Sequence, residues 1–223
     1  MIDTLTLYTD EFRIKEPYPA FQIKRSNLDA STGAFEPEFD ILKTGSEAML
    51  GRSAYLNSED GLLRIDIDRR GLKLTTEVPK WYGEHNFMPV SERQFPEFSE
   101  SIKRRLEKEN IDLDIDNSRV SRLDLFRNAK MPTEPARYFP VLNTFCSGQM
   151  KINAFGYGCQ GITFQNKQRA ACFYDKRLHL TGKGYDVQGI PENSLRGELR
   201  LKTSKAVRRY GSGLQTFGDL RQN

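Results

Sequence analysis

The chain has 223 residues, 37% of them hydrophobic and 29% charged, so it is long enough for one ordinary core under a heavily solvated surface. Its net charge of +4 permits a polyanionic partner such as a nucleic acid without requiring one. No apolar run approaches the roughly 20 residues of a membrane span, and the three cysteines lack C-x-x-C spacing, which excludes a transmembrane helix and a zinc finger.

The first half of the chain predicts a strand, a loop region, a hairpin and a helix. Residues 2–8 alternate apolar and polar side chains, as a half-buried strand does. Residues 24–60 carry many turn formers and predict loops with short strands. Residues 62–78 predict a hairpin, and residues 95–110 have the apolar spacing of an amphipathic surface helix.

The second half of the chain predicts strands and helices in alternation, with no repeat and no low-complexity linker, which favours a single domain over residues 1–223. The predicted elements are a strand over 120–126, a helix over 134–146, strands over 161–165, 170–177 and 194–202, and a helix over 204–210.

Side chains alternate across a strand, and in several of these strands one parity is apolar while the other mixes acids with bases. This pattern predicts an α+β fold: a central antiparallel sheet with helices packed on one face and a polar face opposite. A solvated sheet stabilised by cross-strand ion pairs is the alternative explanation. The polar parity holds Arg122, Asp124, Arg196, Glu198, Arg200 and Lys202.

The mixed composition of this face indicates a chemistry. Converging carboxylates bind hard cations such as Mg²⁺ or Mn²⁺, and neighbouring arginines and lysines bind phosphate. Together the two kinds of side chain suit reactions of phosphodiesters.

The stretch RAACFYDKRLHL places Tyr174 in the same parity as Cys172 and Lys176. A phenol with an ordinary pKa of about 10 is a poor nucleophile at neutral pH, so a cation beside it is needed to favour the phenolate. Lys176 is the candidate for that cation. A tyrosine that only packs at a sheet edge is the alternative.

Five segments, in this order, resemble the replication initiators of filamentous phages and related plasmids, the gene II protein type. They span nearly the whole chain and read MIDTLTL at the start, TEVPKWYGEHN at 76–86, SRLDLFRNA at 121–129, GITFQNKQRAACFYDKRLHL at 161–180 and LRGELRLKTSKAVRRYG at 195–211. The resemblance implies rolling-circle initiation: site-specific nicking and religation of one DNA strand at a replication origin through a 5′-phosphotyrosine.

The resemblance also implies roles for particular residues. Tyr174 is the expected nucleophile, with Lys176 lowering its pKa or contacting the phosphate. Glu77, Asp124 and Glu198 are the expected ligands of a Mg²⁺ or Mn²⁺ ion. The expected contacts to DNA are Arg122, Arg196, Arg200 and Lys202, with a further basic patch or solvated helix face at Lys205, Arg208 and Arg209.

The chain departs from the best-known initiators and relaxases, which hold their metal with a histidine-hydrophobe-histidine pair. It has only His85 and His179, which cannot form that motif, so a metal site would be mainly carboxylate. The sequence leaves the roles of both histidines open. His179 is a proton carrier if the strand bends after Arg177, and otherwise a surface histidine.

We expect a cytoplasmic protein of a bacterial host that acts on an origin as duplex, hairpin or single-stranded nick site, with host helicase and replication proteins as partners and no membrane. The family usually continues beyond such a chain, so residues 1–223 are expected to be its N-terminal catalytic part. Two rivals remain: a DNA-binding repressor or origin-recognition module without catalysis, and a metal-dependent nuclease that uses water.

Overall fold

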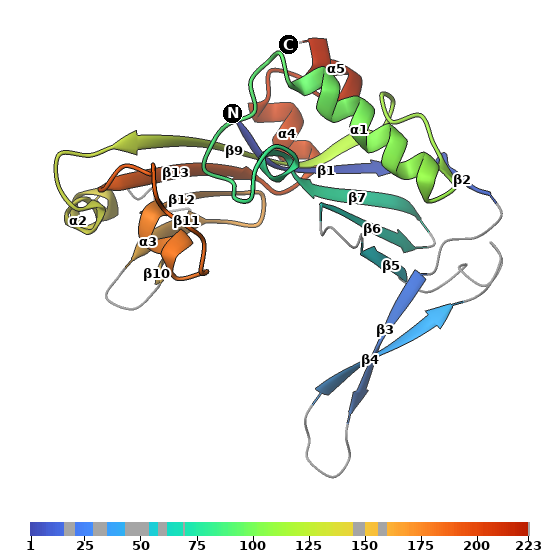
Figure 1. Cartoon of the computed structure of the whole chain (residues 1–223), viewed down its shortest axis with the longest axis horizontal. Coiled ribbons are helices and arrows are strands. Elements are labelled where there is room, and N and C mark those ends of the chain that lie inside the picture. The colour runs from blue at the N-terminus through green and yellow to red at the C-terminus, as the bar shows by residue number, and fades with distance from the viewer. Residues whose placement is uncertain are drawn as a thin grey trace. The chain divides into compact units, whose positions relative to one another are not determined.

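A computed structural model gives the architecture of the chain (Figure 1). The residues it describes are 1–15, 21–28, 35–42, 54–57, 62–68, 70–144, 150–155 and 160–222. The chain divides into two compact units. Unit 1 comprises residues 1–5, 77–94 and 120–215, and unit 2 comprises residues 6–76, 95–119 and 216–223. The single-domain organisation stays a prediction.

Unit 1 is built on antiparallel strands in the order β10-β11-β12-β13-β9, with β1 as the next neighbour. The strands are β10 (Lys151–Phe155), β11 (Gly161–Gln165), β12 (Arg169–Asp175), β13 (Ser194–Leu201), β9 (Arg119–Lys130) and β1 (Ile2–Thr9). The backbone N–H of Phe126 in β9 donates to the carbonyl of Met1, which fixes the start of the chain beside β9.

Helices of unit 1 lie on both faces of its sheet. They are the 3-10 turns η2 (Val78–Trp81) and η3 (Pro135–Tyr138) and the helices α2 (Phe139–Asn143), α3 (Lys176–Thr181) and α4 (Ser204–Tyr210). Phe139 of α2 packs with Phe164 and Phe173 on one face. His179 of α3 contacts the ring of Tyr174, which points to the opposite face from Phe173.

Unit 2 has the strand order β7-β6-β5-β3-β4, with the end of β1 next to β7. Its elements are β3 (Phe21–Leu28), β4 (Phe35–Leu42), β5 (Ala54–Asn57), β6 (Leu63–Asp68), β7 (Gly71–Glu77), the small pair β2 (Arg13–Ile14) and β8 (Ile111–Asp112), and the helices α1 (Phe95–Lys108) and α5 (Phe217–Gln222). Phe98, Ile102 and Leu106 of α1 are buried, so the predicted apolar stripe of this helix faces the core.

The α+β class predicted from the sequence is confirmed, because antiparallel ladders are combined with helices. The sequence also predicts helices on only one face of the sheet. In unit 1, α2 and α3 instead pack on opposite faces. The strand over 161–165 and the helix over 204–210 match β11 and α4. In the range 24–60, for which loops with short strands are predicted, the described residues form the paired strands β3 and β4, each of eight residues, and the short strand β5, and the rest of the range lies outside the described residues. Within the described part of the chain, no helix is long and apolar enough to cross a membrane.

Two predicted elements end earlier than expected. The helix predicted over 134–146 is split into η3 and α2, because Pro140 lacks an N–H and sits in the first turn of a new helix. The strand predicted over 170–177 stops at Asp175, whose carboxylate accepts a hydrogen bond from the N–H of Leu178 at 2.9 Å and caps α3.

Candidate active site

The ladders of unit 1 bring the polar side chains of three strands to one face. Arg196 of β13 stands opposite Tyr174 on one side, Glu198 opposite Cys172, and Arg200 opposite Asp124 of β9 on the other. Residues paired across a ladder point to the same face of a sheet. We call this surface, formed by β12, β13 and β9, the polar face. It carries the polar residues that alternate with apolar ones along the strands in the sequence.

The hydroxyl of Tyr174 donates a hydrogen bond to Oε1 of Glu198, and only 5% of Tyr174 is exposed. The same carboxylate oxygen lies 3.0 Å from Nε of Arg196, whose side chain is completely buried. The guanidinium of Arg196 lies over the ring of Phe126, with Cζ 3.7 Å from the ring centroid. Tyrosine, carboxylate and arginine thus form one buried polar core.

Two residues that the sequence did not single out complete this network. Asp3 of β1 accepts from Nη2 of Arg196 at 2.5 Å and from the side-chain amide of Asn86 at 2.8 Å. Asn86 also accepts from the ammonium of Lys176 at 2.5 Å through its side chain and from Arg196 through its backbone carbonyl. The loop that carries Asn86 therefore ties β1, α3 and β13 together beside Tyr174.

The pKa of Tyr174 is raised, because its hydroxyl is buried and because the negative charge of Glu198 opposes the phenolate; Arg196 acts in the other direction. The ammonium of Lys176 lies 5.8 Å from the centroid of the Tyr174 ring, and the expectation that Lys176 favours the phenolate stays a prediction. Burial, with the nearby charge of Arg196, lowers the pKa of Lys176 to about 7. The pKa of Glu198 is lowered although burial opposes it, because Tyr174 and Arg200 donate to its carboxylate.

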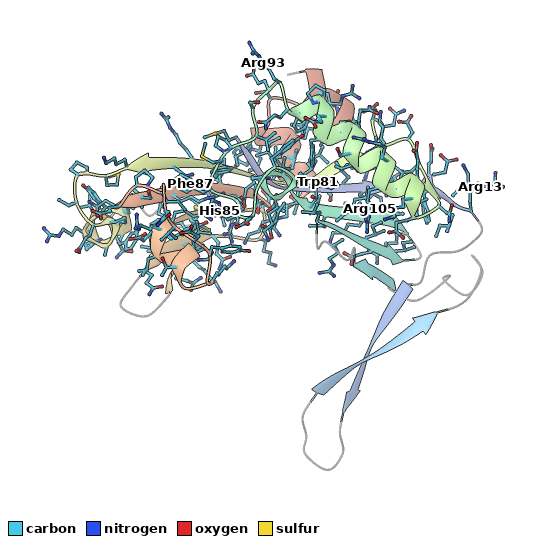
Figure 2. All side chains as sticks on the ribbon, viewed as in Figure 1. Arg13, Trp81, His85, Phe87, Arg93 and Arg105 are labelled. Atoms are coloured by element: carbon cyan, nitrogen blue, oxygen red, sulfur yellow. The ribbon has the colours of Figure 1, made fainter. Side chains whose placement is uncertain are left out.

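The two histidines have different surroundings. His179 lies on α3 with its ring centroid 5.1 Å from that of Tyr174, and burial together with Lys176 and Lys183 lowers its pKa to about 4, so it is neutral near pH 7. His85, labelled with Phe87 in Figure 2, makes edge contacts with Phe87 and Tyr185. The strand does end before His179, but a helix rather than a bend brings the imidazole to the tyrosine.

The carboxylates proposed as metal ligands are held by cations. Asp124 accepts two hydrogen bonds from Arg122, at 2.9 and 2.6 Å, and Glu198 accepts two from Arg200, at 3.0 and 2.6 Å. Glu77 is 44% exposed and pairs with Lys80 at 3.1 Å. Among the described residues, no three His, Cys, Asp or Glu side chains gather as a metal site would require. In this arrangement the three acids do not fit a divalent ion.

The basic residues predicted to contact DNA fall into two groups. Arg196 is wholly buried and serves the internal network in this arrangement, so its contact with DNA stays a prediction. The remaining ones, Arg122, Arg200, Lys202, Lys205, Arg208 and Arg209, are at least partly accessible.

The sequence holds one signal for the burial of Asp3. Asp3 has the same parity as Leu5 and Leu7, which are buried, so an acid at this position is expected to be buried and to need a cation. Asn86 has no comparable signal, because its partners depend on the path of the loop after η2.

Searches against protein-family models and against curated proteins found no match to this chain.

Proposed function

We propose that the chain is a rolling-circle replication initiator that nicks and religates one strand of origin DNA through a 5′-phosphotyrosine on Tyr174. The observation that carries the proposal is the direct hydrogen bond from the phenol of Tyr174 to Glu198, on a sheet face that also holds partly exposed arginines. A phosphoryl transfer needs a nucleophile, a base that accepts its proton, and cations that bind the phosphate.

The nicking step is a transesterification in which bonds and protons balance. The oxygen of Tyr174 bonds to the phosphorus of one phosphodiester, and the bond from that phosphorus to the 3′ oxygen breaks. Glu198 accepts the phenol proton, while the departing 3′ oxygen takes a proton from water. The phosphotyrosine conserves the energy of the broken bond, so the reverse reaction reseals the strand without a nucleotide cofactor.

A buried tyrosine must be uncovered before it attacks DNA. Asn86 hydrogen-bonds to Asp3, Lys176 and Arg196, so displacement of its loop is the movement that would expose the site. Entry of DNA phosphate would compensate the cations that this movement releases from Asn86.

The proposal includes Mg²⁺ or Mn²⁺ as a cofactor, double-stranded origin DNA with its hairpin or single-stranded nick site as substrate, host helicase and replication proteins as partners, and the cytoplasm of a bacterial host as location. A divalent ion would neutralise charge on the scissile phosphate. Since Asp124 and Glu198 are occupied by arginines, no step is assigned to the ion, and the assay is run with and without it.

The test is incubation with a supercoiled plasmid that carries the replicon DNA surrounding the chain's own gene, with Mg²⁺, with Mn²⁺ and with EDTA. We expect nicked circles and a covalent protein–DNA adduct from the wild type, and neither from Tyr174→Phe. Tyr185→Phe, which removes a phenol on a loop of unit 1, is the matched control and is expected to retain both. Adduct formation by Tyr174→Phe at the wild-type level would remove the proposal.

A binding module without catalysis is the second candidate, and the burial and raised pKa of Tyr174 favour it. It predicts retention of origin DNA with neither nick nor adduct under any metal condition. Nicking without adduct would instead indicate hydrolysis by water.

A further inference from the structure

Two arginines of the polar face are each fixed by a buried carboxylate two residues along the same strand. Arg122 uses Nε and Nη2 on Asp124, and Arg200 uses Nε and Nη2 on Glu198. The carboxylate side chains are 3% exposed, whereas Arg122 and Arg200 are 41% and 37% exposed. The acids are thus inside the structure and the guanidinium groups reach its surface.

The two guanidinium groups are also near each other. Arg200 stands opposite Asp124, the residue that holds Arg122. The positive charge of Arg200 disfavours the charged form of Arg122, and the negative charge of Asp124 favours the charged form of Arg200. The two positive charges repel each other, and the buried carboxylates of Asp124 and Glu198 supply counter-charges.

Donors remain on the outer side of this pair. Both arginines use Nε and Nη2 for their carboxylates, and the described residues give neither Nη1 a hydrogen-bond acceptor. Lys202 follows on the same parity and is bonded to the neutral oxygens of Gln165 and Asn166, at 2.8 and 3.4 Å, so no acid neutralises it among these contacts. Fixed, parallel N–H groups beside a cation are what a phosphate group recognises.

We propose that Arg122 and Arg200 form a clamp for a backbone phosphate of a DNA strand, and that Asp124 and Glu198 orient this clamp rather than bind a metal ion, Glu198 in addition to its role as base. The inference rests on the proposed function in taking DNA as the ligand. It goes further by giving both carboxylates a role in DNA binding that requires no metal ion.

The test measures the affinity of a labelled single-stranded oligonucleotide by fluorescence anisotropy in EDTA. Arg122→Lys and Arg200→Lys keep the positive charge and lose the planar guanidinium group with its several N–H donors. Each is expected to weaken binding roughly five- to tenfold. Asp124→Asn and Glu198→Gln are expected to weaken binding to a similar extent in EDTA, because the arginine is no longer held. Circular dichroism melting of each variant identifies any loss of folding, and the lysine variants leave both carboxylates in place.

A matched control exists on β6, where Arg64 donates to Asp66 at 2.8 Å with the same two-residue spacing. Arg64→Lys and Asp66→Asn are expected to leave the affinity unchanged. Inorganic phosphate as competitor separates a site for a free anion from one for a strand: strong competition at low concentration, with no gain in affinity from a longer oligonucleotide, would contradict a strand clamp.

Two other results would overturn the inference. The first is unchanged affinity of Asp124→Asn and Glu198→Gln in EDTA together with loss of Mn²⁺ binding measured by electron paramagnetic resonance, which would make the acids metal ligands. The second is unchanged affinity of both lysine variants. Failure of the proposed function is distinct, because absence of a Tyr174 adduct in the wild type leaves the EDTA binding data and their interpretation in place.

Discussion

At the scale of single residues, the environment of Lys176 in unit 1 disfavours its positive charge. Its side chain is completely buried, its ammonium donates to Asn86, and Arg196 adds a second positive charge nearby. Burial of a cation costs free energy unless a counter-charge compensates it. Asp3 and Glu198 favour the charged form, but burial outweighs them and the pKa falls to about 7.

This environment predicts a pH dependence of stability. In the unfolded chain Lys176 keeps its proton up to its ordinary pKa of 10.5, whereas in the folded protein it loses it near 7, so unfolding takes up a proton between these values. The free energy of unfolding should therefore rise from about pH 7 to about pH 9.5, by at most about 1.4 kcal/mol per pH unit. Urea titrations of the wild type and Lys176→Met measure the difference.

Lys176→Met should remove this part of the slope and leave the rest of the pH profile parallel. Above the ordinary pKa of tyrosine, 10.0, the raised pKa of Tyr174 acts in the opposite direction, because the unfolded phenol then loses its proton first. Wild-type and Lys176→Met profiles that run parallel through the whole range would contradict the lowered pKa of Lys176.

At the scale of elements, the polar face could be predicted from the sequence and the network behind it could not. Alternation is local, so period two places Glu198 and Arg200 on one face of β13, whereas the pairing of β13 with β9 is what puts Asp124 on the same face. The bonds from Arg196 to Asp3 and to Asn86 join residues 193 and 110 positions apart, and no local pattern encodes them. The same holds for His179, whose approach to Tyr174 depends on where β12 ends.

The loop that carries Asn86 is expected to hold the site closed. Asn86→Ala removes the acceptor of Lys176 and a donor to Asp3, so the folded protein should lose about 1–3 kcal/mol of stability. Amide hydrogen exchange over residues 82–88 should become faster, and α1, in unit 2, should not change. Protection of this loop equal to that of the wild type would show that Asn86 does not fasten it.

The start of β7 is fixed by a close approach of backbone. A Cβ on Gly71 would lie 2.3 Å from the carbonyl oxygen of Thr9 and 2.9 Å from the hydroxyl of Tyr8, and a backbone oxygen cannot move aside as a flexible side chain can. Gly71→Ala should therefore cost roughly 1–3 kcal/mol, measured by thermal melting. A melting temperature equal to that of the wild type would contradict this contact between β1 and β7.

At the scale of the whole molecule, the net charge is modest, and DNA binding depends on where the basic residues lie. The net charge is only +4, yet arginines and lysines gather on the polar face of unit 1 and on α4, where Lys205, Arg208 and Arg209 are exposed. Binding that depends on such groups releases counterions, so DNA affinity should fall steeply as salt rises. This term supplies affinity for any sequence, and recognition of an origin has to come from other contacts.

The central claim is that Tyr174 becomes covalently joined to DNA, and peptide mapping tests it most directly. The wild type is incubated with the replicon plasmid and a divalent ion, the reaction is denatured, and nuclease and protease digestion precede mass spectrometry. We expect the peptide containing Tyr174 to carry the mass of a nucleotide 5′-phosphate on the tyrosine. A nucleotide on a different residue, or nicked plasmid with no modified peptide, would contradict the account.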